Sequence, residues 1–190
     1  LPGAVYADLN RDLAAPATAT SGCHPLPSPE TFAARLRAWG VNAGSCVVAY
    51  DDGNSAYAAR LWWMLRWLGH DEVLVLDGGM RRWLALGLPL DEEVPVPPGG
   101  DFVARLRPDC AVDAATVLEA ARDATARVID VRAPERYRGE VEPIDAVAGH
   151  VPGARNHPFT SSLDAQGRFL PPDELRRRGT NIQRLAENGV

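Results

Sequence analysis

The residues best suited to chemistry lie in one stretch, Val128 to Phe159, which reads VIDVRAPERYRGEVEPIDAVAGHVPGARNHPF. Its short apolar run ends at Asp130 and leads to Arg132, and a charged, helical-looking segment then carries Arg136. A buried strand that stops at an aspartate delivers polar side chains to the end of a parallel sheet, where α/β proteins hold their ligands. The stretch therefore predicts a ligand-binding or catalytic site.

The elements before this stretch alternate between strands and helices, which is typical of an α/β protein with a parallel, doubly wound sheet. Ser28 is a good N-cap for a helix that Gly40 ends. The helix of residues 56–68 is apolar nearly all round, so we expect it to pack on the sheet. We expect residues 1–10 to lead into a strand and residues 46–50 and 73–76 to form buried strands. The expected helices are residues 29–39, 56–68 and 80–86.

A linker divides the chain. Pro97-Pro98-Gly99-Gly100 cannot continue a helix or a central strand. We therefore predict a first domain at residues 1–95, a linker at 96–108 and a second domain at 109–190. In the second domain, we expect one helix to open at residues 112–114 and a last one to be capped by residues 171–174.

Composition excludes several classes of function. The net charge of -5 comes with no basic block, so we expect no nucleic-acid partner. No stretch approaches the ~20 apolar residues of a membrane span. The three cysteines, Cys23, Cys46 and Cys110, have neither metal-site spacing nor the even number of a disulfide framework. We expect a cytoplasmic protein with no metal and no cofactor, and the sequence leaves its oligomeric state open.

A short internal repeat bears on the architecture. Leu1-Pro2-Gly3-Ala4 and Val151-Pro152-Gly153-Ala154 are the same turn, and each is followed by a loop and a helix that opens with Pro and an acidic residue. The strand at residue 46 follows Leu1 by 45 residues, and the same spacing after Val151 leads beyond Val190. We expect the chain to hold the back part of one domain and the front part of another.

The central stretch resembles the signature of the rhodanese sulfurtransferases. Their domains carry a strand that ends in D-x-R, an arginine at the place of Arg136, and a G-H-I-P-G-A-x-N turn, which stands here at residues 149–156. Two-domain rhodaneses join tandem copies of one α/β fold. The resemblance implies two rhodanese-like domains with parallel sheets flanked by helices, the first without its opening strand and the second without its C-terminal half.

The resemblance also implies the site residues. Arg136 corresponds to the family's substrate arginine, Asp130 would orient the site by hydrogen bonds, and Tyr57 would wall the substrate pocket from the first domain. The residues themselves leave alternatives open. Arg136 can be a solvated helix charge, Asp130 a turn cap and Tyr57 part of the core of a domain interface. Asp51 stands where the catalytic copy has its cysteine, as in the non-catalytic first domains of the family.

Three further residues of the stretch are expected to have structural roles. Arg132 is predicted to pair with Asp130 or Glu135. His150 and Asn156 are predicted to stabilise the Pro-Gly turn by hydrogen bonds rather than to catalyse.

No cysteine of the chain is a good nucleophile, because activation of a thiol requires an electropositive pocket. Cys46 starts an expected buried strand, where a thiol is inert. Cys110 lies at the entry to the second domain, and the only cationic neighbour of Cys23 in the sequence is His24. We therefore expect no catalytic residue in the chain. The nucleophilic cysteine would lie beyond Val190, and the chain by itself would be inactive.

The function implied for the full-length parent is transfer of a sulfane sulfur from thiosulfate to cyanide or a thiol through a cysteine persulfide. The partners would be a small anionic sulfur donor and a thiol or cyanide acceptor. The mercaptopyruvate branch of the family usually has a second arginine after its Glu-Pro pair, but Ile144 follows Glu142-Pro143 here. We therefore expect thiosulfate to be the preferred donor. The alternative is a non-catalytic rhodanese-like protein that binds an anion or a partner.

Overall fold

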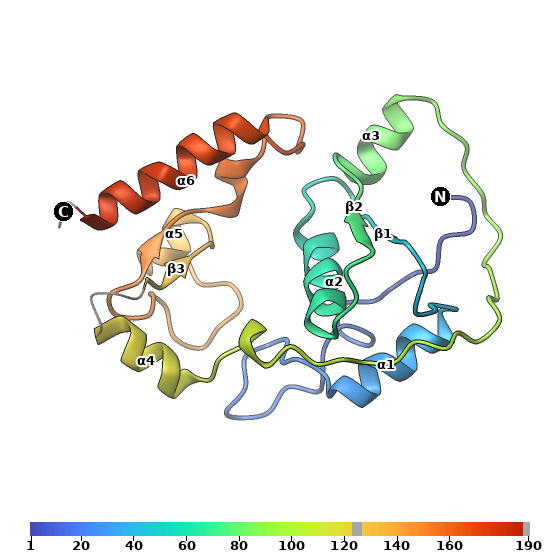
Figure 1. Cartoon of the computed structure of the whole chain (residues 1–190). Coiled ribbons are helices and arrows are strands. Elements are labelled where there is room, and N and C mark those ends of the chain that lie inside the picture. The colour runs from blue at the N-terminus through green and yellow to red at the C-terminus, as the bar shows by residue number, and fades with distance from the viewer. Residues whose placement is uncertain (123–126, 188–190) are drawn as a thin grey trace. The chain divides into compact units, whose positions relative to one another are not determined.

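The computed structural model describes residues 1–122 and 127–187 and divides the chain into two compact units (Figure 1). The first unit is Leu1–Cys110 and the second is Ala111–Val190. Each has a pair of parallel strands with helices beside it. The predicted α/β class with parallel strands and flanking helices is thereby confirmed.

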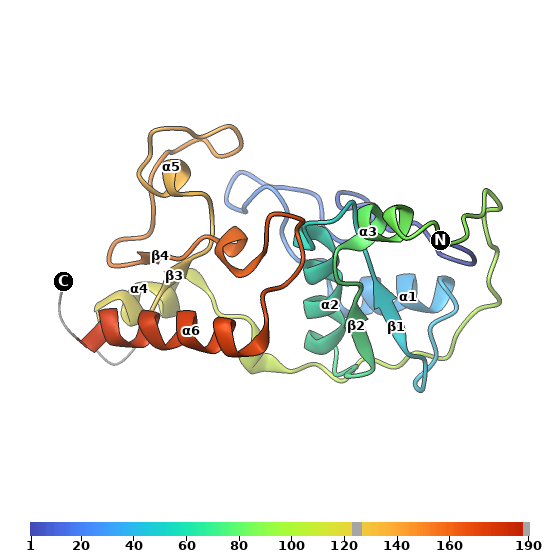
Figure 2. The same ribbon diagram turned by 90° about the horizontal axis from the view of Figure 1, so that it is seen from above.

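The first unit is built on strands β1 (Val47–Ala49) and β2 (Val73–Val75), which pair in parallel with Val48 opposite Leu74. Helix α2 (Ala56–Trp67) connects them and packs against both, as its apolar surface predicts (Figure 2). Helix α1 (Pro29–Ala38) begins at its predicted N-cap, where Ser28 Oγ accepts a hydrogen bond of 3.1 Å from Thr31 N. The short elements α3 (Gly79–Ala85) and η1 (Pro108–Cys110) follow.

The core of the first unit lies between α1 and α2. Its largest fully buried side chains are Phe32, Leu36, Met64, Leu65 and Leu68. The tryptophans of α2 belong to this core or border it, because Trp67 is buried while Trp62 and Trp63 pack partly buried against it.

The predicted linker contributes to the same core. Phe102 is 2% exposed, and the backbone N–H groups of Arg105 and Arg107 donate to the carbonyl oxygens of Leu68 and Trp67. Residues 96–108 therefore run along the first unit.

The expectation of fully buried strands in the first unit is wrong. Val48 and Leu74 lie opposite each other and are 50% and 59% exposed. Cys46, just before β1, is exposed as well. Helix α2 covers one face of the strand pair, and among the described residues nothing buries the other. The strand expected within residues 1–10 is also not formed, and Leu1 to Ala4 make only a turn.

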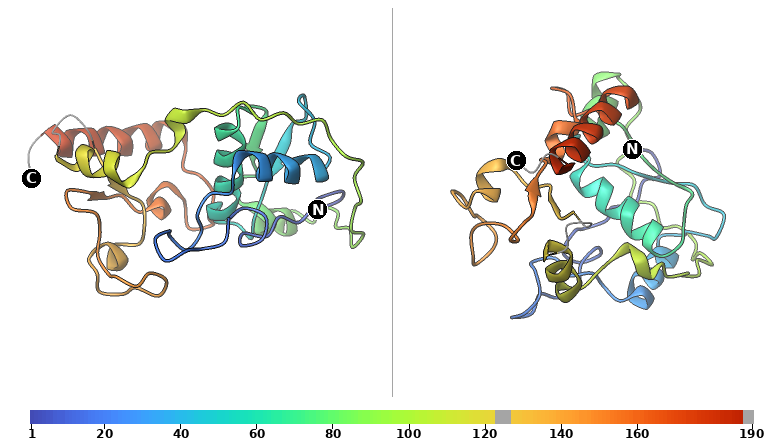
Figure 3. Two further views of the ribbon diagram at one scale, coloured as in Figure 1. Left: turned by 90° about the horizontal axis from the view of Figure 1, so that it is seen from below. Right: turned by 60° about the vertical axis from the view of Figure 1, so that its left-hand side comes forward.

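The second unit is built on strands β3 (Ile129–Asp130) and β4 (Arg155–Asn156), which pair in parallel. Helix α4 (Ala114–Arg122) precedes them, and Asp113 Oδ1 accepts a hydrogen bond from Thr116 N at its start. The short helix α5 (Pro134–Tyr137) and the helix α6 (Pro172–Glu187) lie on opposite sides of the strand pair, and η2 (Phe159–Ser162) follows β4 (Figure 3). Both helices predicted for this unit are thereby confirmed.

Polar contacts rather than a core hold the described part of the second unit. Ala154 is its only buried residue among those whose side chains are described. Arg178 of α6 donates to the carbonyl oxygen of Ser161 and pairs with Glu174 at 2.7 Å. In both units, the described helices include none that is long and apolar enough to span a bilayer.

Candidate functional site

The candidate site lies where strand β3 ends. Asp130 is paired in register with Asn156, and His157 N donates to Asp130 O at 2.9 Å, which continues the parallel ladder past the last strand residue. Asn156 Nδ2 donates to the carbonyl oxygens of Asp130 and Arg132 at 3.0 and 2.9 Å. This side chain therefore fixes the turn that directs the following residues over the end of the sheet. The role of Asn156 is thus structural, but its side chain holds the turn after β3 and not the Pro-Gly turn for which it was predicted.

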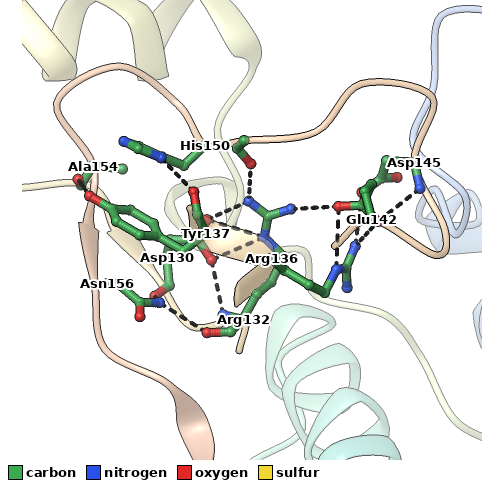
Figure 4. Close-up of polar contacts among 10 residues, drawn as sticks. Asp130, Arg132, Arg136, Tyr137, Glu142, Asp145, His150, Ala154 and Asn156 are labelled. Carbon is green, nitrogen blue, oxygen red and sulfur yellow. Dashed lines mark hydrogen bonds and ion pairs between the residues drawn. The ribbon is translucent and has the colours of Figure 1, made fainter. Parts of the chain in front are cut away.

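Asp130 both caps this turn and pairs with the guanidinium of Arg132 (Figure 4). Its Oδ1 accepts a hydrogen bond of 2.9 Å from the backbone N of Arg132, which is an Asx-turn. Its two oxygens also accept from Nε and Nη2 of the Arg132 side chain, with a shortest distance of 2.6 Å. The hydrogen bonds from Arg132 lower the pKa of Asp130 despite its partial burial. The carboxylate is therefore ionised and committed to Arg132.

Glu142 is the carboxylate on which the arginines converge. It accepts from Arg132 Nη1 at 3.3 Å and from Arg136 Nη2 at 2.6 Å, and the backbone N–H groups of Ile144 and Asp145 donate to it at 3.0 Å each. Its side chain is 5% exposed. The backbone N–H of Asp145 and the guanidinium of Arg136 lower the pKa of Glu142 to about 2. This carboxylate stays charged at any physiological pH and joins the two arginines.

Arg136, the predicted anion ligand, is held by carboxylates. Glu142 occupies the edge of its guanidinium formed by Nε and Nη2, at 3.3 and 2.6 Å, and Asp145 Oδ2 lies 3.1 Å from Nη2. The side chain is 19% exposed. Arg136 is therefore neither freely solvated nor deeply buried, and its position is fixed by contacts.

A wide, open cavity of about 470 Å³ lies beside this cluster. Among its lining residues are Asp130, Arg132, Asp145 and His150. Arg136 is not one of them, but its partner Asp145 is. The cavity wall thus combines one arginine, one histidine and two carboxylates.

The Pro-Gly turn is fastened to α5 through Tyr137. The ring of His150 stacks on that of Tyr137 with centroids 3.8 Å apart, and Tyr137 Oη donates to Ala154 O at 2.8 Å. His150 Nδ1 lies 2.7 Å from Tyr137 O. A carbonyl oxygen only accepts, so Nδ1 carries the proton of this bond. The predicted turn-stabilising role of His150 is confirmed, and Arg132 reinforces the turn by donating to Gly149 O at 2.6 Å.

Arg132 pairs with Asp130 as predicted, but its second partner is Glu142 and not Glu135. The physical reason is the course of the loop after α5. This loop folds back over the strand end and brings Glu142, ten residues from Arg132, onto the guanidinium. Glu142, Asp145 and Tyr137 were not identified from the sequence as site residues. The only available signal was a carboxylate six residues after Arg136.

Asp51 of the first unit has a different environment. Its Oδ1 accepts from the backbone N–H groups of Gly53 and Ser55 at 2.9 and 3.0 Å, and its Oδ2 accepts from those of Tyr57 and Ala58 at 3.0 and 3.1 Å. Four backbone donors at the start of α2 therefore surround one carboxylate, as in an anion-binding nest. A Cβ on Gly79 would clash with the carbonyl oxygen of Asp51, so glycine permits this close packing of the loop.

Tyr57 and the cysteines complete the predicted set. Tyr57 is 59% exposed at the start of α2. Cys23, Cys46 and Cys110 are all exposed, so burial does not account for an inert Cys46. Arg107, which is close in sequence to Cys110, is already engaged by both carboxylate oxygens of Asp71, at 2.9 and 2.6 Å.

Comparisons with known proteins find relatives of this chain. The model described as a rhodanese-like domain matches residues 1–86. A probable 3-mercaptopyruvate sulfurtransferase of Pseudomonas aeruginosa is 47% identical over 186 residues, which cover 97% of this chain and 66% of that protein. A putative thiosulfate sulfurtransferase SseB of Mycobacterium tuberculosis is 41% identical over 90% of this chain and 60% of its own length.

A solved structure shares the fold. The crystal structure of SseA from Escherichia coli, described as showing the rhodanese fold of 3-mercaptopyruvate sulfotransferases, has a TM-score of 0.81 and 39% sequence identity. It covers 93% of this chain, and this chain covers 65% of it. The chain thus spans about two thirds or slightly less of the length of the relatives it matches.

The expected preference for thiosulfate over mercaptopyruvate is wrong. The Pseudomonas relative and the Escherichia coli structure are both described as mercaptopyruvate enzymes. The expectation rested on Ile144, which supplies no cation. The structure shows that Arg132 and Arg136 already converge on Glu142.

Proposed function

Because the chain belongs to the rhodanese-type sulfurtransferase family, we propose that it carries the substrate-anion site of an enzyme that takes sulfur from 3-mercaptopyruvate. The sulfur would pass through a cysteine persulfide to a thiol or to cyanide. The observation that carries this proposal is the guanidinium of Arg136, held beside the end of β3 by the carboxylate of Glu142, whose side chain is 5% exposed. A fixed guanidinium fork is the group best suited to a small carboxylate.

The chemistry of 3-mercaptopyruvate fits this site. It is a 2-oxo acid with one carboxylate and one thiol, and removal of its sulfur leaves pyruvate. Arg136 would bind the carboxylate, while Arg132, which lines the cavity and is fixed by Asp130, would contribute positive potential. Asp130 would act through Arg132 as a positioning residue.

The same proposal assigns a non-catalytic role to the first unit. Asp51 occupies a nest of four backbone N–H groups, which is the environment that stabilises a thiolate or persulfide in this fold. A carboxylate there cannot accept a sulfur atom. We also propose that none of Cys23, Cys46 and Cys110 is the nucleophile, because covalent catalysis needs an activated thiolate.

The proposal is tested by placing this chain in an active background. The 190 residues would replace the matching part of the Pseudomonas relative, and pyruvate release from 3-mercaptopyruvate would be measured. We expect activity in the chimera and a loss on the order of 100-fold in kcat/KM with Arg136→Ala, because a charged hydrogen bond to the substrate is removed. Equal activity of the chimera and its Arg136→Ala variant would refute the proposal.

The alternative, a non-catalytic anion-binding protein, is favoured by the internal carboxylates already present on Arg136. It predicts that the isolated chain binds 3-mercaptopyruvate while the chimera releases no pyruvate. The role of the cysteines is tested separately. If an active chimera keeps full activity after Cys23→Ser, Cys46→Ser and Cys110→Ser, none of these three cysteines is the nucleophile.

A further inference from the structure

We propose that Asp145 is a built-in competitor for the substrate carboxylate on Arg136, and that Glu142 is the positioning residue that keeps Arg136 in place when Asp145 withdraws. This inference rests on the function proposed above. It assigns different roles to two carboxylates that contact the same guanidinium.

The two carboxylates differ in how firmly they are held. The side chain of Glu142 is 5% exposed, and it accepts hydrogen bonds from two arginines and two backbone N–H groups. The side chain of Asp145 is 44% exposed, lines the cavity, and meets Arg136 through one contact of 3.1 Å. Removal of Glu142 would leave its donors unsatisfied, whereas the ion pair between Asp145 and Arg136 is partly exposed, and such a pair contributes little to stability.

The geometry of the Arg136 guanidinium identifies the edge at which Asp145 and a substrate carboxylate would compete (Figure 4). Glu142 binds side-on, to Nε and Nη2, and leaves the end-on edge formed by Nη1 and Nη2. Within the described part of the chain, Nη1 donates to no group, and Asp145 takes the second hydrogen of Nη2. A substrate carboxylate that binds end-on needs both Nη1 and Nη2. It must therefore displace Asp145 or share Nη2 with it.

Asp145 then has a defined effect on affinity. Its negative charge satisfies Arg136 while the site is empty and repels any anion that approaches the open edge. A carboxylate that accepts hydrogen bonds from both Nη1 and Nη2 can replace Asp145, while an anion that makes only one of these hydrogen bonds cannot. Substitution of Asp145 by asparagine removes the repulsion and should raise the affinity for carboxylates. A variant that failed to fold would instead bind more weakly.

The test measures binding of 3-mercaptopyruvate to the whole chain by calorimetry and by the Nε–H NMR signal of Arg136. We expect Asp145→Asn to bind roughly five-fold tighter than the wild type and Glu142→Gln to bind on the order of ten-fold more weakly. The Nε–H signal should persist in Asp145→Asn and be lost in Glu142→Gln, because among the described residues Glu142 is the acceptor for Nε. Glu142→Asp should partly restore both the affinity and the signal.

The matched control is Glu140→Gln. It removes the same charge from the same loop, but Glu140 pairs with Arg138 and is 56% exposed. Its affinity for 3-mercaptopyruvate should equal that of the wild type. A second control uses mercaptoacetone, which keeps the thiol and the ketone but lacks the carboxylate. Asp145→Asn should not improve its binding.

The outcomes separate this inference from the function on which it rests. If the wild type binds 3-mercaptopyruvate and Arg136→Ala does not, the proposed anion site stands. Asp145→Asn binding no tighter than Glu140→Gln would then overturn the competitor role alone. If Arg136→Ala binds as well as the wild type, both proposals fail. If the difference in affinity between Asp145→Asn and the wild type decreases as salt is added, the competitor role is supported, because salt screens the repulsion.

Discussion

The two units are organised around different forces. The first has an apolar core in which Phe32, Leu36 and Leu65 are fully buried, and its carboxylate Asp51 is satisfied by backbone N–H groups. In the second, Ala154 alone is buried among residues with described side chains, and its carboxylate Glu142 is satisfied largely by guanidinium groups. The first arrangement fixes a carboxylate in a nest of backbone N–H groups, and the second fixes arginine side chains beside a cavity. Only the second is suited to bind an anion.

The repeated turn shows the same contrast. Ala4 N donates to Leu1 O at 3.1 Å and Ala154 N donates to Val151 O at 2.9 Å, so both copies form the turn. In the second unit the chain then enters β4, which pairs with β3. In the first unit Val5 and Tyr6 follow, and no strand is described at these residues. The turn is a local property of its sequence, whereas the strand depends on a partner.

The largest expected effect is on the core of the first unit. Leu65→Ala removes a fully buried side chain and should destabilise this unit by about 2–5 kcal/mol. Chemical denaturation followed by far-ultraviolet circular dichroism would report a loss in either unit, because both units contain helices. Leu118→Ala, on the half-exposed surface of α4, is the matched control and should change little. A loss of similar size in both variants would contradict the contrast between the units.

A smaller effect is expected in the loop of Asp51. Asp51→Asn keeps the size of the side chain but replaces one acceptor oxygen with an amide N–H that faces backbone donors. We expect a loss of about 1–3 kcal/mol in the free energy of unfolding of the first unit. Asp52→Asn, in the adjacent exposed position, serves as the control. Unchanged stability of Asp51→Asn would mean that the nest does not require an anion.

The smallest effect is expected from moderate acid on the second unit. The folded-state pKa of Glu142 is depressed from 4.5 to about 2. Its contribution to stability is therefore present above pH 4.5 and is lost only as the pH falls through about 2. The Arg136 Nε–H signal should persist from neutral pH to about pH 3. Its loss near pH 5 would show that Glu142 does not hold the arginine.

Local signals in the sequence were sufficient for much of the fold. Ser28 caps α1, Asp113 caps α4, and the Pro-Gly turn forms around residues 151–154 because each depends on neighbours within a few positions. Burial was predicted less well. The pattern of CVVAY is that of a strand covered on both faces, but covering depends on other segments, and Val48 is half exposed.

The site shows the same limit. Asp130, Arg132 and Asn156 were located from the sequence because the strand end brings them together. Glu142 was not predicted as a site residue. Its role arises only when the loop after α5 folds back and places it between two arginines. No spacing rule for a helix or strand predicts that return.

The measurement that tests the central claim most directly is hydrogen exchange on the whole chain with and without 3-mercaptopyruvate. Without it, we predict strong protection in residues 46–76 and little in residues 128–159, because the apolar core lies in the first unit. With it, protection should rise in residues 128–159 and stay unchanged in residues 46–76, because a ligand stabilises the part that binds it. An equal rise in both regions, or none in residues 128–159, would contradict the assignment of the anion site to the second unit.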